Sequence, residues 1–135
     1  TEARSIAGKA LELKPDSALA LRMLGLCELQ QGNHQQSVEL LEESIKHDPD
    51  SWESYLNLAT AYQLLGRYDK ARQAAERVIE LQPEEPLGHY RAGTALLLMD
   101  RPADGITYLR HATELDPTYV DSWVNRASAA NSLSL

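Results

Sequence analysis

Apolar residues recur three and four positions apart along successive stretches of the chain, which is the spacing of one face of an α-helix. Residues that end helices separate these stretches at regular places. Prolines follow the stretches at Pro15, Pro49, Pro83 and Pro117, at a constant 34-residue step. About halfway between consecutive prolines lie Gly32, Gly66 and Asp100, which suit the left-handed conformation of a short turn. The pattern therefore predicts helix, turn, helix in every unit.

The fixed period predicts stacked copies of one structural unit. We call the first helix of a unit its A helix and the second its B helix. We expect an all-α fold of about eight helices in a single domain over residues 1–135. Its predicted parts are the B helix of a leading half-repeat, three full repeats and the A helix of a trailing repeat or capping helix, at 1–17, 18–51, 52–85, 86–119 and 120–135.

Two columns of small residues recur at the same step. On the A helices the column is Gly25, Ala59, Gly93 and Ala127. On the B helices it is Ala3, Ser37, Ala71 and Gly105. Small side chains let two helix backbones approach closely, so we expect the A and B helices of a unit to touch at these columns.

At these residues the chain resembles the tetratricopeptide repeat family, whose pattern is W-x2-L-G-x2-Y, then A-x3-F, then P. The second unit matches best, through Tyr55, Leu58, Ala59, Tyr62, Gly66, Tyr68, Ala71 and Pro83. The resemblance covers the whole chain. It implies a right-handed α-solenoid whose A helices line the concave side, and a non-catalytic scaffold that binds a peptide or partner segment in that groove.

The positions of the A helices that are left free by the packing columns are the candidates for this groove. One column again follows the 34-residue step: Met23, Asn57, Arg91 and Asn125. An asparagine amide can hold a peptide main chain, and an arginine can bind a carboxylate through two hydrogen bonds. We predict that the polar anchors are Arg22, Asn57, Arg91 and Asn125 and that the apolar lining is Leu26, Leu56, Tyr90 and Leu97. Alternatively, the asparagines only face solvent or bond to a neighbouring helix.

The asparagines resemble the ladders with which some family members hold peptide main chains. A second resemblance is to the carboxylate clamp of chaperone-binding members, which hold a C-terminal Glu-Glu-Val-Asp tail. At the clamp positions Asn57 and Arg91 match, and Arg22 replaces a lysine. Leu26 and Leu87 stand where the clamp has polar residues, which favours a more apolar ligand.

Charge and composition exclude several functions. With 13 Lys and Arg against 20 Asp and Glu, the net charge is −7, which argues against nucleic-acid binding. No apolar run approaches the length of a membrane span, so we expect no membrane insertion. No signal-peptide pattern opens the chain, which says little about where the protein is located. The location stays open, with a cytoplasmic one favoured.

Nothing in the sequence predicts catalysis, a cofactor or a metal. The seven glycines form no phosphate-binding loop, and the four histidines have no metal-ligand spacing. We interpret the histidines (His34, His47, His89 and His111) as solvated surface residues. We interpret Cys27, the only cysteine, as an inert buried thiol.

Two alternatives to the peptide scaffold stay open. The first is a substrate-recognition region of a larger enzyme, such as a glycosyltransferase or a sulfotransferase. The second is a self-assembling structural module. For the second, Ala127, Ala129, Ala130 and Leu133 of the last helix are expected to lie where a B helix would pack. The ends of an uncapped solenoid expose apolar surface, which predicts head-to-tail self-association.

Overall fold

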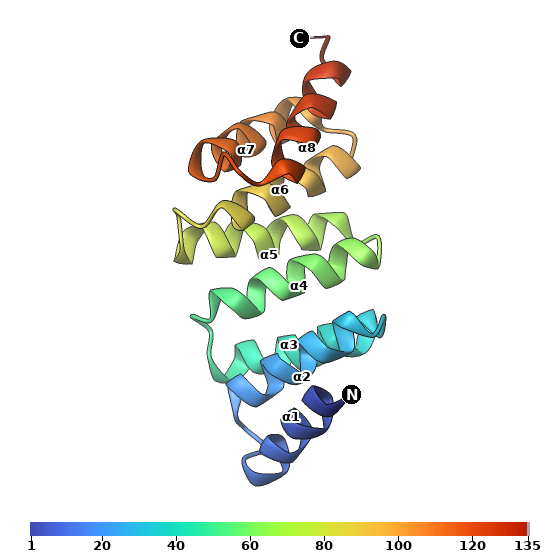
Figure 1. Cartoon of the computed structure of the whole chain (residues 1–135), viewed down its shortest axis with the longest axis vertical. Coiled ribbons are helices and arrows are strands. Elements are labelled where there is room, and N and C mark those ends of the chain that lie inside the picture. The colour runs from blue at the N-terminus through green and yellow to red at the C-terminus, as the bar shows by residue number, and fades with distance from the viewer. Residues whose placement is uncertain (135) are drawn as a thin grey trace.

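The computed structural model describes residues 1–134, and within them the chain forms eight helices that stack one after another along its long axis (Figure 1). The helices are α1 (Glu2–Leu13), α2 (Ala18–Gln30), α3 (His34–His47), α4 (Trp52–Leu64), α5 (Tyr68–Leu81), α6 (Pro86–Leu98), α7 (Pro102–Leu115) and α8 (Val120–Ser132). The all-α solenoid predicted from the fixed period is confirmed. The A helices are α2, α4, α6 and α8, and the B helices are α1, α3, α5 and α7.

Local chemistry sets the helix ends. The Ser17 and Ser51 hydroxyls accept hydrogen bonds from backbone N–H groups in the first turns of α2 and α4, as N-caps do. At the other turns the backbone adopts positive φ at Gly32 (86°), Gly66 (75°) and Asp100 (58°). Asp100 therefore takes the left-handed conformation that was predicted for it.

The A helices α2, α4 and α6 each pack closely on the B helix that follows. A Cβ atom built on Gly93 would lie 2.6 Å from Cγ of Leu109, and one built on Gly105 would lie 2.9 Å from the carbonyl oxygen of Gly93. In the first repeat the Ser37 hydroxyl donates to the Gly25 carbonyl at 2.7 Å. Residues without large side chains are thus needed at these positions, because the backbones of the A helix and the B helix touch there. The sequence placed Ala129 of α8 where a following B helix would pack, which is wrong, because Ala129 is fully buried in the core cluster of α6 and α7.

The A helices lie on the more tightly packed side of the array. Each A helix contacts the next: α2 touches α4, α4 touches α6 and α6 touches α8. Among residues 1–134, no two B helices pack directly on one another. The A helices therefore form the inner side of the solenoid and the B helices the outer side.

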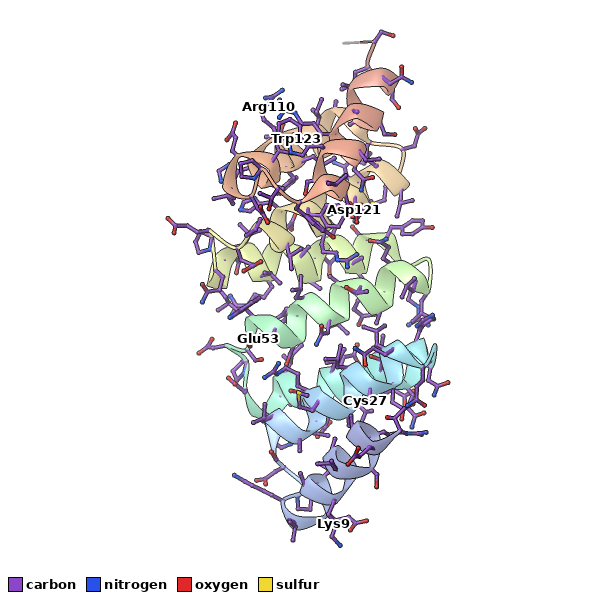
Figure 2. All side chains as sticks on the ribbon, viewed as in Figure 1. Lys9, Cys27, Glu53, Arg110, Asp121 and Trp123 are labelled. Carbon is purple, nitrogen blue, oxygen red and sulfur yellow. The ribbon has the colours of Figure 1, made fainter. Side chains whose placement is uncertain are left out.

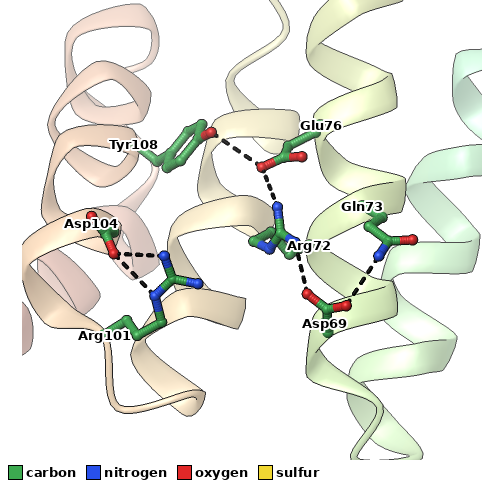
Figure 3. Close-up of polar contacts among 7 residues, drawn as sticks. All are labelled: Asp69, Arg72, Gln73, Glu76, Arg101, Asp104 and Tyr108. Atoms are coloured by element: carbon green, nitrogen blue, oxygen red, sulfur yellow. Dashed lines mark hydrogen bonds and ion pairs between the residues drawn. The ribbon is translucent and has the colours of Figure 1, made fainter.

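Side chains link two of the outer helices where their backbones do not meet (Figure 3). On α5, Arg72 pairs with Asp69 at 2.7 Å and with Glu76 at 2.8 Å. Glu76 also accepts a hydrogen bond from the Tyr108 hydroxyl of α7 at 3.4 Å. Burial and the nearby Glu76 carboxylate raise the pKa of Tyr108, so its phenol stays protonated as the donor.

Two of the proline corners are closed by a ring N–H group of the helix that follows each corner. His89 Nε2 lies 2.8 Å from the Pro83 carbonyl oxygen, and Trp123 Nε1 donates to the Pro117 carbonyl at 2.9 Å. The interpretation of His89 as a solvated histidine is wrong. It is only 8% exposed, and its ring lies against His111 of α7 with the ring centroids 4.4 Å apart.

The glycine contacts predict opposite effects for two alanine substitutions. Gly93→Ala should lower the free energy of unfolding by about 1–3 kcal/mol, because the new methyl group overlaps Leu109. Gly8→Ala is the control, since a Cβ at Gly8 of α1 meets no atom within 4 Å. It should raise stability by about 0.5–1 kcal/mol. Urea denaturation followed by circular dichroism measures both; equal effects would contradict the close approach of α6 and α7.

The buried imidazole predicts a loss of stability in mild acid. Burial lowers the pKa of His89, the nearby His111 lowers it further, and the hydrogen bond to Pro83 opposes the change. The unfolded chain then takes up a proton below about pH 6.5, before the folded chain does, so stability falls as the pH falls. His89→Gln keeps an N–H donor but cannot titrate. Denaturation between pH 7.5 and pH 5.5 should show a smaller loss for this variant, and an equal loss would contradict the assignment.

Candidate functional site

The inner face of the array is made by side chains that point away from the A–B contacts. The 34-residue step places Met23 on α2, Asn57 on α4, Arg91 on α6 and Asn125 on α8. Met23 is 40% exposed and the other three are half-buried. Because the A helices contact one another in sequence, this column runs along the inner side of the array.

Asn57 and Asn125 differ in what their amides already bind. Within residues 1–134 the Asn57 side chain makes no hydrogen bond to protein, so its donor and acceptor both remain available to a ligand. The Asn125 amide donates to the Thr94 hydroxyl on α6 at 2.9 Å. Asn125 therefore makes the bond to a neighbouring helix that the sequence left as the alternative.

The two arginines of the candidate groove carry charge without a carboxylate partner. Neither Arg22 nor Arg91 forms an ion pair in the part of the chain that the structure describes, although the chain is acidic. The Arg91 guanidinium carbon lies 5.4 Å from the Tyr90 ring centroid, and its Nε is buried without a hydrogen-bond partner. Arg91 is thus a partly buried cation with unused hydrogen-bonding capacity.

The four apolar residues predicted to line the groove divide into two pairs. Leu26 and Leu56 are half-buried on α2 and α4. Tyr90 is buried and meets Tyr119 edge-to-face, with the ring centroids 5.0 Å apart. Tyr90 and Leu97 both pack on the core cluster around Leu109. Tyr90 has little surface left for a ligand, whereas Leu97 is half-buried like Leu26 and Leu56.

Carboxylates also occur on the inner helices. Glu53 stands in the first turn of α4 and Asp121 in the first turn of α8, one on each side of α6 along the array (Figure 2). The corresponding residues of α2 and α6 are Leu19 and Leu87. The candidate groove thus alternates between apolar and acidic residues along its length, with the cation Arg91 on the helix between the two carboxylates.

Thr94 was not singled out from the sequence. Its hydrogen bond with Asn125 joins α6 to α8, the A helices of two successive repeats. The available signal was the column next to the asparagines, which carries Leu26, Thr60, Thr94 and Ser128 at the same step. Three of these four residues carry a hydroxyl, but within residues 1–134 only that of Thr94 bonds to a neighbouring A helix, since the Thr60 hydroxyl donates to Leu56 in its own helix.

The described residues contain no group of three or more His, Cys, Asp or Glu side chains arranged to hold a metal ion. Cys27 is buried, as predicted. No helix within residues 1–134 is both long enough and apolar enough to cross a membrane.

Comparison with known proteins supports the repeat assignment along most of the chain. Three family models, each described as tetratricopeptide repeat, match residues 1–51, 28–92 and 88–119. A Hsp70-Hsp90 organising protein of Plasmodium falciparum is 31% identical over 80 residues, which cover 59% of this chain and 32% of that protein. The chain spans between 4% and 32% of the length of the curated relatives it matches.

Solved structures share the architecture. MamA superposes with a TM-score of 0.90 at 20% identity, covering 98% of this chain and 77% of MamA. The first repeat domain of Spaghetti (RPAP3), bound to the HSP90 peptide SRMEEVD, superposes with a TM-score of 0.85 at 18% identity, covering 88% of this chain and 94% of that one. At these identities the likeness shows the fold. The three family models show that the chain belongs to the tetratricopeptide repeat family.

Proposed function

We propose that this chain is a non-catalytic interaction module that holds a peptide or an extended partner segment against the inner face of α2, α4, α6 and α8. The observation that carries the proposal is that two polar residues of the inner column, Asn57 and Arg91, keep unused bonding capacity. Asn57 has no protein partner for its amide within the described residues, and Arg91 has no carboxylate partner there.

The column favours a ligand with a carboxylate and exposed main-chain groups. Arginine can bind a carboxylate with two parallel hydrogen bonds, and an asparagine amide can pair with both the N–H and the C=O of an extended peptide. Arg22 and Arg91 supply the cations, on α2 and α6. Asn57 lies on α4, which contacts both of these helices. These three residues therefore suit one acidic, extended segment better than a small molecule.

The apolar positions restrict the ligand further. Leu26 and Leu87 occupy two positions where the carboxylate clamp resembled by this chain has polar side chains. Leu19 and Met23 are exposed on α2, at the N-terminal end of the inner face. We therefore propose a peptide that has one carboxylate near Arg91 and apolar side chains toward α2.

The related proteins support a peptide as the class of ligand. One relative is named as a Hsp70-Hsp90 organising protein, and one structural neighbour was solved with a peptide of HSP90. Neither name identifies the partner of this chain. What they support is a peptide as a class of ligand for a repeat array of this kind.

A peptide-array screen followed by fluorescence polarisation tests the proposal. The wild-type chain and the double variant Asn57→Ala/Arg91→Ala are compared on the peptides that the wild type selects. We expect the double variant to bind about tenfold more weakly or worse, since hydrogen bonds to a charged group contribute about 1.5–3 kcal/mol. The selected peptides should contain Asp, Glu or a free C-terminal carboxylate together with apolar residues.

Arg110→Ala is the matched control, because Arg110 is an exposed arginine on the outer helix α7 (Figure 2). It removes the same charge from the chain but leaves the inner face intact. Its affinity should equal that of the wild type. Unchanged binding in the double variant, or an equal loss in Arg110→Ala, would refute the assignment of the groove.

A further inference from the structure

The outer side of the array carries a cavity of about 400 Å³ between α4 and α5, which we call the outer cavity. The Tyr62 hydroxyl of α4, which lies in its lining, donates to Glu42 of α3. Because α3 and α5 are both outer helices, the cavity opens between them, on the side of the array away from Asn57 and Arg91. Its main lining residues are Tyr55, Leu58 and Tyr62 of α4 and Lys70, Ala74 and Arg77 of α5.

The floor of the outer cavity is apolar and aromatic. Leu58, Tyr62 and Ala74 are buried, and Tyr55 is half-buried. Burial and the Glu42 carboxylate raise the pKa of Tyr62, so its phenol stays protonated and keeps donating to Glu42. The polar end of Tyr62 is therefore already bonded, and the floor offers ring faces and aliphatic carbons to a large apolar side chain.

Two cations of α5 stand at the rim, each over a tyrosine of the floor. The Lys70 Nζ atom lies 5.6 Å from the centroid of the Tyr62 ring, and the Arg77 guanidinium carbon lies 5.7 Å from the centroid of the Tyr55 ring. Each ring face attracts the cation above it, which holds the two positive groups over the cavity.

These cations remain able to bind a further negative group. Within residues 1–134, Lys70 forms no ion pair and is exposed. Arg77 pairs with Glu80 at 2.7 Å and lies 3.8 Å from Asp50, but both carboxylates are on the surface. Exposed pairs of this kind stabilise a protein little, so a ligand carboxylate can compete for Arg77.

The combination of two tyrosines and two cations occurs at one place in the array. At the 34-residue step, the positions of Lys70 and Arg77 hold Gln36 and Glu43 on α3 and Asp104 and His111 on α7. The positions of Tyr55 and Tyr62 hold Leu21 and Glu28 on α2 and His89 and Leu96 on α6.

A second cavity, of about 380 Å³, lies farther along the outer side, next to α5 and α7. Its cations are already neutralised by carboxylates of the chain: Arg72 pairs with Asp69 and Glu76, and Arg101 pairs with Asp104 (Figure 3). Among the described residues, the outer cavity between α4 and α5 is thus the one that joins an apolar floor to a cation without a carboxylate.

We propose that the outer cavity binds an extended segment of a partner protein in which one large apolar side chain stands between two acidic residues. The apolar side chain packs on Tyr55 and Ala74, and the two carboxylates meet Lys70 and Arg77. Charge complementarity selects this occupant. The chain as a whole carries a net charge of −7, whereas the rim of this cavity is positive.

The spacing of the cations fits an extended segment. Seven residues separate Lys70 from Arg77, which is about 10 Å along a helix. In an extended chain the side chains of residues i, i+2 and i+4 point the same way, and the outer two are about 13 Å apart. The long side chains of lysine, arginine and glutamate bridge this difference. An acidic, apolar, acidic pattern at alternate residues therefore matches the rim and the floor together.

The outer cavity is independent of the inner face. Its residues point outward from α4 and α5, whereas Asn57 and Arg91 lie on the inner column. Two different segments can therefore occupy the array at once, one on each side. This makes the chain an adaptor between two partners, and either site can exist without the other.

A titration of the ¹⁵N-labelled chain, followed by NMR, tests the proposal. The probe is the peptide Glu-Gly-Trp-Gly-Glu with both ends blocked, so that its only charges are the two carboxylates. We expect the amide signals of residues 55–62 and 70–77 to shift. Replacing the tryptophan by glycine, or both glutamates by lysine, should weaken binding about fivefold or more, since each change removes one part of the match.

Lys70→Glu reverses the unpaired charge at an exposed position, so the fold should persist, as circular dichroism checks. It should weaken the acidic peptide about fivefold or more and strengthen the lysine peptide. Arg110→Glu is the matched control, because it makes the same charge change at an exposed position of α7 and should bind like the wild type (Figure 2). The inner-face variant Asn57→Ala/Arg91→Ala should also bind the probe like the wild type.

Four results would overturn the proposal. The first is the absence of shifts in residues 55–62 and 70–77 at about 1 mM peptide. The second is unchanged binding in Lys70→Glu, and the third is an equal loss in Arg110→Glu. The fourth is a loss in Asn57→Ala/Arg91→Ala, which would place the probe on the inner face. Failure of the inner-face proposal alone would leave the binding of this probe unchanged.

Discussion

The close approach of two helix backbones at paired small residues is the contact on which the rest of this structure depends. At Gly93 and Gly105 the approach is so close that a Cβ atom on either residue would meet the other helix at less than 3 Å. This distance fixes how each A helix sits on its B helix. Because the pair recurs in every repeat, it also fixes the register in which the inner side chains line up. The column of Met23, Asn57, Arg91 and Asn125 is a consequence of that packing.

Much of this arrangement could be predicted from the sequence, because its causes are local and periodic. Proline and glycine mark the corners through their own backbone preferences, and Asp100 adopts the left-handed turn because its position in the repeat demands it. Cys27 is buried because its position faces the core. The constant period predicts the helix ends, the turns and the buried positions, even when the contacts between repeats are not known.

The parts that sequence reasoning missed depend on contacts between distant residues. His89 is buried by its own corner and by His111 of α7, the next helix along the chain. Asn125 is held by Thr94 of another repeat, and Tyr90 packs on Tyr119. Each of these contacts depends on the side chains that two neighbouring helices happen to carry. A column of equivalent positions predicts which residues share a face, but not which of them bond to each other.

The uneven packing of the two sides makes the array mechanically compliant. Inner helices touch their neighbours directly, whereas among the described residues the outer helices α5 and α7 are linked by the Glu76–Tyr108 hydrogen bond. Bending that opens or closes the outer side breaks few contacts between B helices. The array should therefore bend about the row of A helices, which is its stiffest part. A segment bound along the A helices would set the curvature of the array. Pulling on the two termini would change the spacing of the residues that hold this segment.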